Sequence, residues 1–162
     1  MELPEPDRAD AARMWASYLA SGAEMHGERD MPSVEYFGDS PALADELLGL
    51  VLSGRKRATA TLAAEFGADG EPLPRIGGHW IACDGGGAPR VVLRTTELRL
   101  GPITSADAAF ARDEAEDDGS LPVWLDGHRR YWSRVAAARG LEFTDATEIV
   151  FERFDVVWSE AP

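Results

Sequence analysis

The sequence predicts an α+β domain. Its strand-like and helical segments do not alternate in a regular βαβ rhythm, and the helices between the strands differ in length. A chain of 162 residues is long enough to form one domain with its own core. A hydrophobic content of 44% and five tryptophans argue against disorder. We expect a small, partly closed β-barrel with helices packed outside it.

The first predicted element is a helix over residues 7–20, for which Asp7 is a suitable N-cap. Residues 22–34 lack hydrophobic periodicity and are expected to form a loop. We therefore expect an N-terminal helix and loop over residues 1–33 and the main domain over 34–162, together a single compact unit. The helix has an apolar stripe at helical spacing, formed by Ala11, Met14, Trp15, Tyr18 and Leu19.

A second helix is predicted to start after Ser40, a good N-cap, with Pro41 at its first position. Gly54 is well placed to end it in a left-handed conformation. The cationic triplet at 55–57 therefore begins where the chain leaves the helix. The apolar face comprises Leu43, Leu47, Leu50 and Val51.

Strands are predicted over residues 58–66, 79–83, 90–100 and 148–158, where β-branched residues or alternating polarity occur. Residues 84–87, an aspartate and three glycines, are expected to form the turn of a hairpin. No Gly-Lys-Ser/Thr follows these glycines, so they do not make a phosphate loop.

Residues 104–107 resemble a capping box, so a short helix is expected after them. The acidic run over 113–119 is typical of a solvated surface. Ser120 can cap a third long helix, which Gly140 ends. One stripe of this helix holds Leu121, Trp124, Leu125, His128, Trp132 and Val135. His128 on that stripe is expected to be a hydrogen-bonded, partly buried histidine.

Lys56 is the only lysine among the 16 cationic residues, and the other fifteen are arginines. Arginine does not lose its proton in a protein, whereas a desolvated lysine can become a base or a nucleophile. A single lysine between Arg55 and Arg57, at the junction of two elements, is therefore a candidate for chemistry. The alternative is that three cations at the end of a helix are solvated and interact with its dipole.

The formal charge of −13 excludes broad, non-specific binding of nucleic acid, because such affinity comes from neutralising many phosphates. Only residues 53–99 carry more bases than acids, seven against five. No double-stranded DNA partner is expected. No apolar run is long enough to span a membrane, and the acidic N-terminus does not resemble a signal peptide, so a cytoplasmic location is expected. One cysteine, Cys83, excludes an internal disulfide and a cysteine-based metal site.

Several motifs, taken in order, resemble the ASCH domain family over about residues 34–158. These motifs are Phe37-Gly38-Asp39-Ser40, Ser53-Gly54-Arg55-Lys56-Arg57-Ala58-Thr59, Glu114-Ala115-Glu116 with Ser120-Leu121, and Trp124, His128 and Tyr131. The resemblance implies a PUA-like β-barrel and a cleft that binds RNA or a nucleoside. It also implies catalytic roles for Lys56, Thr59 and Glu116. The residues expected to bind substrate are Arg55, Arg57, Glu114, Ser120, Trp124, His128 and Tyr131.

Some relatives implied by this resemblance are similar to ribonucleases, and smaller ones deacylate N4-acetylcytidine. The chain departs from the family pattern at two positions. Ala115 stands where the acidic element often has glycine, and Thr61 where the small deacetylating members have arginine. An RNA-directed hydrolase of the ribonuclease type is therefore expected first.

Two alternatives stay open: an amidohydrolase acting on a modified nucleoside, and a non-catalytic RNA-binding module. The chemistry differs between them. For amide hydrolysis, a neutral Lys56 would take a proton from Thr59, with Glu116 holding the lysine. For phosphodiester cleavage, a charged Lys56 would stabilise the phosphorane while His128 or Tyr131 moves protons. The expected partner is single-stranded RNA or a modified nucleoside. The cofactor is unknown: a divalent metal is compatible with a ribonuclease, although no metal motif can be read.

Overall fold

The computed structural model describes residues 1–22, 29–67 and 72–160. This part of the chain divides into two units, each with its own apolar core. Unit 1 comprises Met1–Gly54, Arg75–Thr96 and Phe154–Pro162, and unit 2 comprises Arg55–Pro74 and Glu97–Arg153. Because the chain passes between the units several times, each unit is assembled from segments that lie far apart in the sequence.

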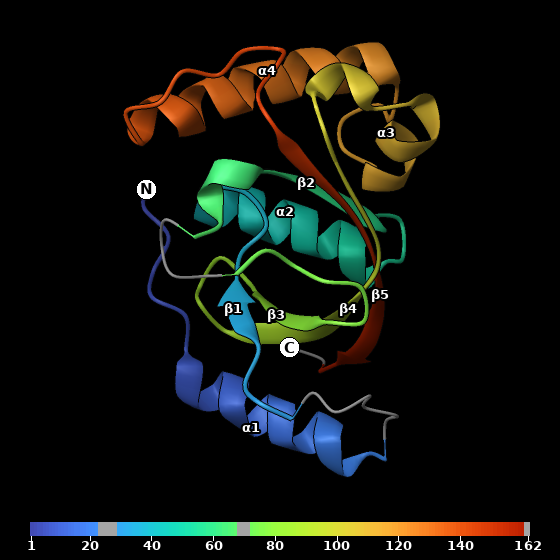
Figure 1. The fold of residues 1–162 in the computed structure, drawn as a ribbon. Helices are drawn as coiled ribbons and strands as arrows, with labels where there is room; N and C mark the ends of the chain where they lie inside the picture. The colour runs from blue at the N-terminus through green and yellow to red at the C-terminus, as the bar shows by residue number, and fades with distance from the viewer. Residues whose placement is uncertain (23–28, 68–71, 161–162) are drawn as a thin grey trace. The chain divides into compact units, whose positions relative to one another are not determined.

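Unit 1 contains helix α1 (Arg8–Ala20), strand β1 (Ser33–Glu35), helix α2 (Pro41–Leu52) and strand β3 (His79–Cys83). It also contains the first part of strand β4 (Pro89–Gly101) and the last part of strand β5 (Ile149–Ser159). Figure 1 labels these elements. Strand β1 pairs in parallel with β3, and β3 pairs antiparallel with β4. Helix α1 and β1 share one core with β3 and β4, and α2 shares a second core with the same two strands.

Unit 2 contains strand β2 (Ala58–Leu62), helix α3 (Ala108–Glu114) and helix α4 (Leu121–Ala138), with the remaining parts of β4 and β5. Strand β2 pairs antiparallel with β5, so that Ala58 lies opposite Arg153. The two helices pack with β2 and β5 around a single core in which Trp124, Trp132 and Phe151 are buried. This unit positions all the candidate catalytic residues.

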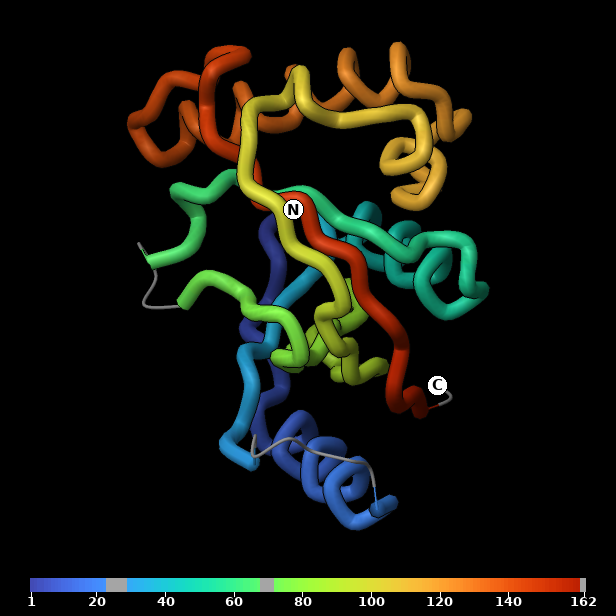
Figure 2. The backbone as a smooth tube through the Cα atoms, turned by 45° about the vertical axis from the view of Figure 1, so that its right-hand side comes forward, coloured from blue at the N-terminus to red at the C-terminus, as the bar shows by residue number. Residues whose placement is uncertain are grey.

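The five strands form one sheet in the order β1-β3-β4-β5-β2. The long strands β4 and β5, which belong to both units, lie next to one another (Figure 2). The sheet and its helices confirm the predicted α+β class. None of the helices in the described ranges is both long and apolar enough to cross a membrane. The predicted domain boundary at residue 34 stays a prediction.

The predicted helix starts are confirmed by their caps. Asp7, Ser40 and Ser120 each accept a hydrogen bond from the backbone three residues later. Gly54 and Gly140 have φ angles of 80° and 71°, the left-handed conformation expected just after a helix. The strand over 79–83 has the predicted bounds.

Four local predictions were wrong. The capping box at 104–107 does not form: Ile103–Ser105 makes a 3₁₀ turn, and Asp107 caps α3 by accepting from the Phe110 amide at 2.8 Å. The strand predicted over 58–66 stops at Leu62. A 3₁₀ turn over Ala63–Glu65 follows, and the Leu62 amide donates to the side chain of Glu65 at its end. Strand β1 was missed because three residues show no alternation. The acidic run over 113–119 is not fully solvated, because Glu114 is buried.

Candidate active site

The site is built where two segments of unit 2 meet. Arg57 immediately precedes β2. Its backbone amide donates at 2.7 Å to the carbonyl of Asp113, which lies in the last turn of α3. Lys56 precedes Arg57, and Glu114 follows Asp113. This backbone hydrogen bond therefore places the only lysine of the chain next to the acidic segment that follows α3.

Lys56 is fully buried and contacts three oxygens. Its Nζ donates to the backbone carbonyl of Glu114 at 3.4 Å, to Oε1 of Glu114 at 3.4 Å and to Oε1 of Glu116 at 3.3 Å. A buried ammonium requires this kind of pairing, because an isolated charge in the interior is very costly. This contact joins Lys56 to Glu116, which lies sixty residues further along the chain.

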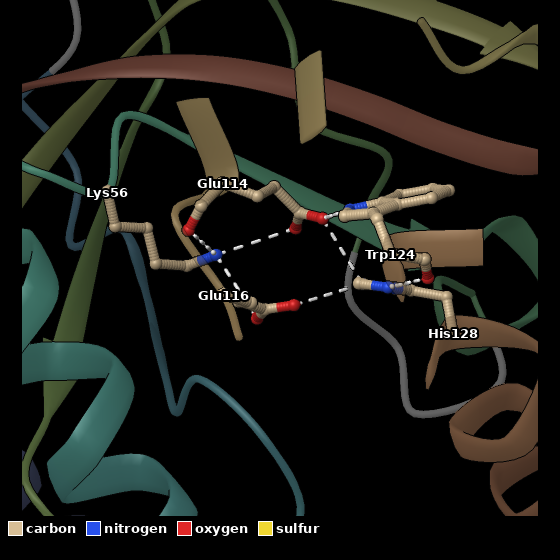
Figure 3. A network of polar contacts seen from close by, with 5 residues as sticks. All are labelled: Lys56, Glu114, Glu116, Trp124 and His128. Carbon is tan, nitrogen blue, oxygen red and sulfur yellow. Dashed lines mark hydrogen bonds and ion pairs between the residues drawn. The ribbon is translucent and has the colours of Figure 1, made fainter. Parts of the chain in front are cut away.

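His128 approaches the same two glutamates from the opposite side, as Figure 3 shows. Its Nε2 lies 3.2 Å from Oε2 of Glu114 and 3.2 Å from Oε2 of Glu116. Its Nδ1 lies 2.9 Å from the backbone carbonyl of Trp124. A carbonyl only accepts hydrogen bonds, so Nδ1 carries a proton and donates it. Nε2 is therefore the nitrogen that exchanges a proton with the carboxylates.

Trp124 fixes the position of Glu114. Its indole Nε1 donates to Oε2 of Glu114, and its ring stacks on His128 with the ring centres 4.1 Å apart. The helical spacing of four residues on α4 brings these two aromatic rings together. Trp124 is buried, so its structural role is to support Glu114 and His128 from the core.

The two glutamates differ in their environment and therefore in their acidity. Burial opposes ionisation of Glu114, but the charges of Lys56 and His128, with hydrogen bonds from His128 and Trp124, lower its pKa to about 2. Burial and the neighbouring charge of Glu114 raise the pKa of Glu116. Burial acts to lower the pKa of His128, but the two carboxylates outweigh it and raise this pKa. Glu114 is thus the permanent anion, and Glu116 and His128 share the exchangeable proton.

The outer part of the site is formed by Glu116 and His128. The side chains of Lys56 and Glu114 are 0% and 1% exposed, whereas those of Glu116 and His128 are 20% and 11% exposed. A molecule in solution can therefore reach the pair that shares a proton before it reaches the lysine. Reaction at this site would start at Glu116 or His128.

Glu114, Glu116 and His128 also offer one ligand atom each within 4.8 Å of one another, a spacing that could hold a metal ion. The carboxylates already have cationic partners, however. Lys56 contacts both of them, and His128 contacts both through Nε2. A metal ion would have to replace the proton on Nε2 and compete with the ammonium, so we assign no metal here.

The remaining predicted site residues do not belong to this network. Thr59 lies in β2 opposite Glu152, half-buried, and the network in Figure 3 does not include it. Arg55 is exposed, and Ser120 caps α4. Tyr131 packs against the core of unit 2, with the Arg134 guanidinium 5.2 Å from its ring centre. Their roles in binding stay predictions.

Sequence reasoning missed Asp113 and Arg153. Arg57 and Arg153 both donate to the carboxylate of Asp113, Arg57 at 3.2 Å. Arg153 also pairs with Glu97 at 2.8 Å. The only signal in the sequence was that Arg153 shares a face of the closing strand with the apolar residues Ile149 and Phe151. Neither residue touches the network directly.

The acidic segment has an unusual backbone. Ala115 and Asp117, on either side of Glu116, have φ angles of 58° and 50° in the left-handed region. A residue with a Cβ atom is strained there by about 1–2 kcal/mol, whereas glycine is not. Glycine, which the resemblance implied at position 115, would relieve this strain.

Replacing Ala115 by glycine should therefore stabilise the protein. Relief of the strain outweighs the extra entropy of an unfolded glycine, for a net gain of about 0.5–1 kcal/mol in the free energy of unfolding. Denaturant unfolding of the Ala115→Gly variant measures this gain. Ala137→Gly, at an exposed position in the last turn of α4, is the control and should destabilise. Equal losses in both variants would contradict the prediction.

Comparison with known proteins shows that the chain is similar to ASCH domains. The family model of the ASCH domain matches residues 33–158. A protein from Enterococcus faecalis V583, described by the family model DUF984, is 29% identical with a TM-score of 0.81. The similarity covers 92% of this chain and 88% of that one. The ASCH domain from Lactobacillus crispatus JV V101 is 28% identical with a TM-score of 0.81, covering 92% of this chain and 94% of that one. No curated protein matches the chain. These similarities confirm the predicted PUA-like fold class.

Proposed function

Because the chain belongs to the ASCH domain family, which is proposed to bind RNA, we propose that it is a hydrolase acting on a nucleoside or on single-stranded RNA beside Glu116. The observation that carries this proposal is the geometry of two neighbouring carboxyl groups. Both contact the same ammonium and the same imidazole, but one is fully buried and the other is partly exposed. The pKa of Glu114 is lowered, and the pKa of Glu116 is raised. Environments that make the pKa values of two neighbouring carboxyl groups differ in this way are typical of acid–base catalysis.

The groups of the network have separate roles in the proposal. Glu116 is the proton-transfer group, because it is partly exposed and its pKa is raised. His128 shares the proton of Glu116 through Nε2. Lys56 and Glu114 are a buried ion pair that holds Glu116 in place. This differs from the expected mechanism, in which Lys56 takes a proton from Thr59.

Of the two hydrolase chemistries, amide hydrolysis of a modified nucleoside fits this geometry better. In that reaction one group can do both proton transfers. Glu116 would take a proton from water as the water oxygen adds to the acyl carbon, then return it to the leaving nitrogen as the C–N bond breaks. Cleavage of a phosphodiester needs an acid and a base on opposite sides of the phosphorus, whereas Glu116 and His128 are in direct contact. An uncharged nucleoside also suits a chain of net charge −13.

Ribonuclease activity is the second candidate, and one observation favours it. Arg55 precedes the site residue Lys56 and is exposed, so it is available to phosphate groups. A divalent metal would be compatible with this reaction. We propose no membrane partner and no double-stranded DNA partner in either case, because the contacts to phosphate would be few.

The test is to incubate the purified protein with N4-acetylcytidine and, separately, with single-stranded RNA with and without Mg²⁺ or Mn²⁺. Acetate release is measured in the first reaction and RNA fragments in the second. We expect acetate release. RNA cleavage without acetate release would select the ribonuclease. Binding of either molecule without turnover would overturn the hydrolase and leave an RNA-binding module.

A further inference from the structure

We propose that Asp113 is a positioning residue, which sets the contact between Lys56 and the two site glutamates through its hydrogen bonds to Arg57 and Arg153. This inference deepens the proposed function, and its effect on turnover rests on that function. Asp113 itself contacts neither glutamate side chain in the network of Figure 3. Its proposed action runs through its neighbours in the chain.

The backbone of Asp113 provides the first link. Its carbonyl accepts from the Arg57 amide at 2.7 Å, which joins the end of α3 to the start of β2. Lys56 and Glu114 are the adjacent residues on the two segments. A displacement of one segment relative to the other would therefore change two distances. These are the 3.4 Å from Lys56 Nζ to Glu114 Oε1 and the 3.3 Å from Lys56 Nζ to Glu116 Oε1.

The carboxylate of Asp113 provides the second link. One oxygen accepts from the Arg57 guanidinium at 3.2 Å, and the other accepts from Arg153. Arg153 lies in β5 directly opposite Ala58, the first residue of β2. One carboxylate thus connects α3, the entry to β2 and β5 at a single point.

Arg153 is itself held in place, which makes it a firm anchor. Its Nε donates to Glu97 in β4 at 2.8 Å, and its guanidinium lies 5.5 Å from the ring centre of Phe110 in α3. Its side chain is 29% exposed, whereas that of Arg57 is 68% exposed. Exposed ion pairs contribute little, so the Arg153 contact is the more important of the two for Asp113.

The left-handed backbone of Ala115 explains why such an anchor is needed. The residue after Glu114 has a φ angle of 58°, and Asp117 has 50°, so the segment that carries Glu116 holds two strained residues. A strained segment persists only when its surroundings fix it. Asp113 and Glu114 are the two side chains just before this segment that are tied to other elements by ion pairs, and only Asp113 links it to β5.

The test compares Asp113→Asn with Asp145→Asn. Both variants remove one negative charge. Asp113→Asn weakens two aspartate–arginine ion pairs, and Asp145→Asn weakens one. Asp145 pairs with Arg129 on α4, the helix that carries His128, through bonds of 3.0 and 2.9 Å. Two readouts are measured: the NMR signal of the Trp124 indole N–H, which reports its bond to Glu114, and kcat and KM separately.

We expect Asp113→Asn to shift the Trp124 indole signal and to lower kcat by about 10- to 100-fold, the effect of a small misplacement of a catalytic group. KM should change less than about twofold, since Asp113 is not one of the five residues of the network. Asp145→Asn should leave both readouts unchanged. An indole signal that is the same in the two variants would overturn the inference.

The indole signal also separates this inference from the proposed function. If no substrate is turned over but the signal shifts only in Asp113→Asn, the proposed function fails and the positioning role stands. If Asp113→Asn does not fold, the Trp124 indole signal of Arg153→Gln tests the inference instead. This variant removes the main ion-pair partner of Asp113 and keeps the Asp113 carboxylate. An unshifted signal in Arg153→Gln would overturn the inference.

Discussion

Replacing Glu114 by glutamine is expected to lower the free energy of unfolding by about 3 kcal/mol. Glu114 is the permanent anion of the buried network, with Lys56 on one oxygen and His128 and Trp124 on the other. Removing one partner of a buried ion pair lowers the free energy of unfolding by about 3–5 kcal/mol, because the other partner is left as an uncompensated buried charge. The lower end applies here, since Glu116 still contacts both Lys56 and His128 in the variant.

Chemical denaturation measures this loss as a lower midpoint at an unchanged slope. Asp118→Asn is a suitable control, because it makes the same change at an exposed position of the same acidic run. A double-mutant cycle with Lys56→Met isolates the ion pair. The double variant should lose at least about 1 kcal/mol less than the sum of the two single variants. Additive losses, or a Glu114→Gln protein as stable as Asp118→Asn, would show that the pair contributes nothing to the fold.

Much of the fold could be predicted because its signals are local. The caps at Asp7, Ser40 and Ser120 and the left-handed glycines at 54 and 140 each depend on a few neighbouring residues. The wrong predictions arose where local signals compete. Thr104 and Asp107 are both acceptable caps by composition, and only the 3₁₀ turn before α3 decides between them.

The candidate site could be predicted only in part for the same reason. The unusual single lysine pointed to Lys56, and the order of motifs pointed to Glu116. The acidic run, by contrast, gave no indication that Glu114 is buried, because a charge run is usually solvated. The anchoring of Asp113 by Arg153 joins residues forty positions apart, and no pattern within either segment predicts it.

Replacing Glu116 by glutamine is expected to have the largest effect on turnover. If Glu116 transfers the proton, the variant should lose about 10²- to 10⁴-fold in kcat, the usual contribution of a positioned acid–base group. Glutamine keeps the size of the side chain and an oxygen that can accept from Lys56. The loss should therefore appear in kcat, while KM and the thermal stability change much less. The substrate is whichever of the two proposed classes the wild-type protein turns over.

The pH profile separates a proton-transfer role from a structural one. A base acts only when deprotonated, so kcat/KM of the wild-type protein should rise with pH through the pKa of Glu116, which is raised above its ordinary value. That rise should be absent in Glu116→Gln. Asp118→Asn, two residues further along and outside the network, should keep both the rate and the rise. A Glu116→Gln protein with the turnover of Asp118→Asn would remove Glu116 from the chemistry. The network of Lys56, Glu114 and His128 would then be a structural element that orders the segment after α3.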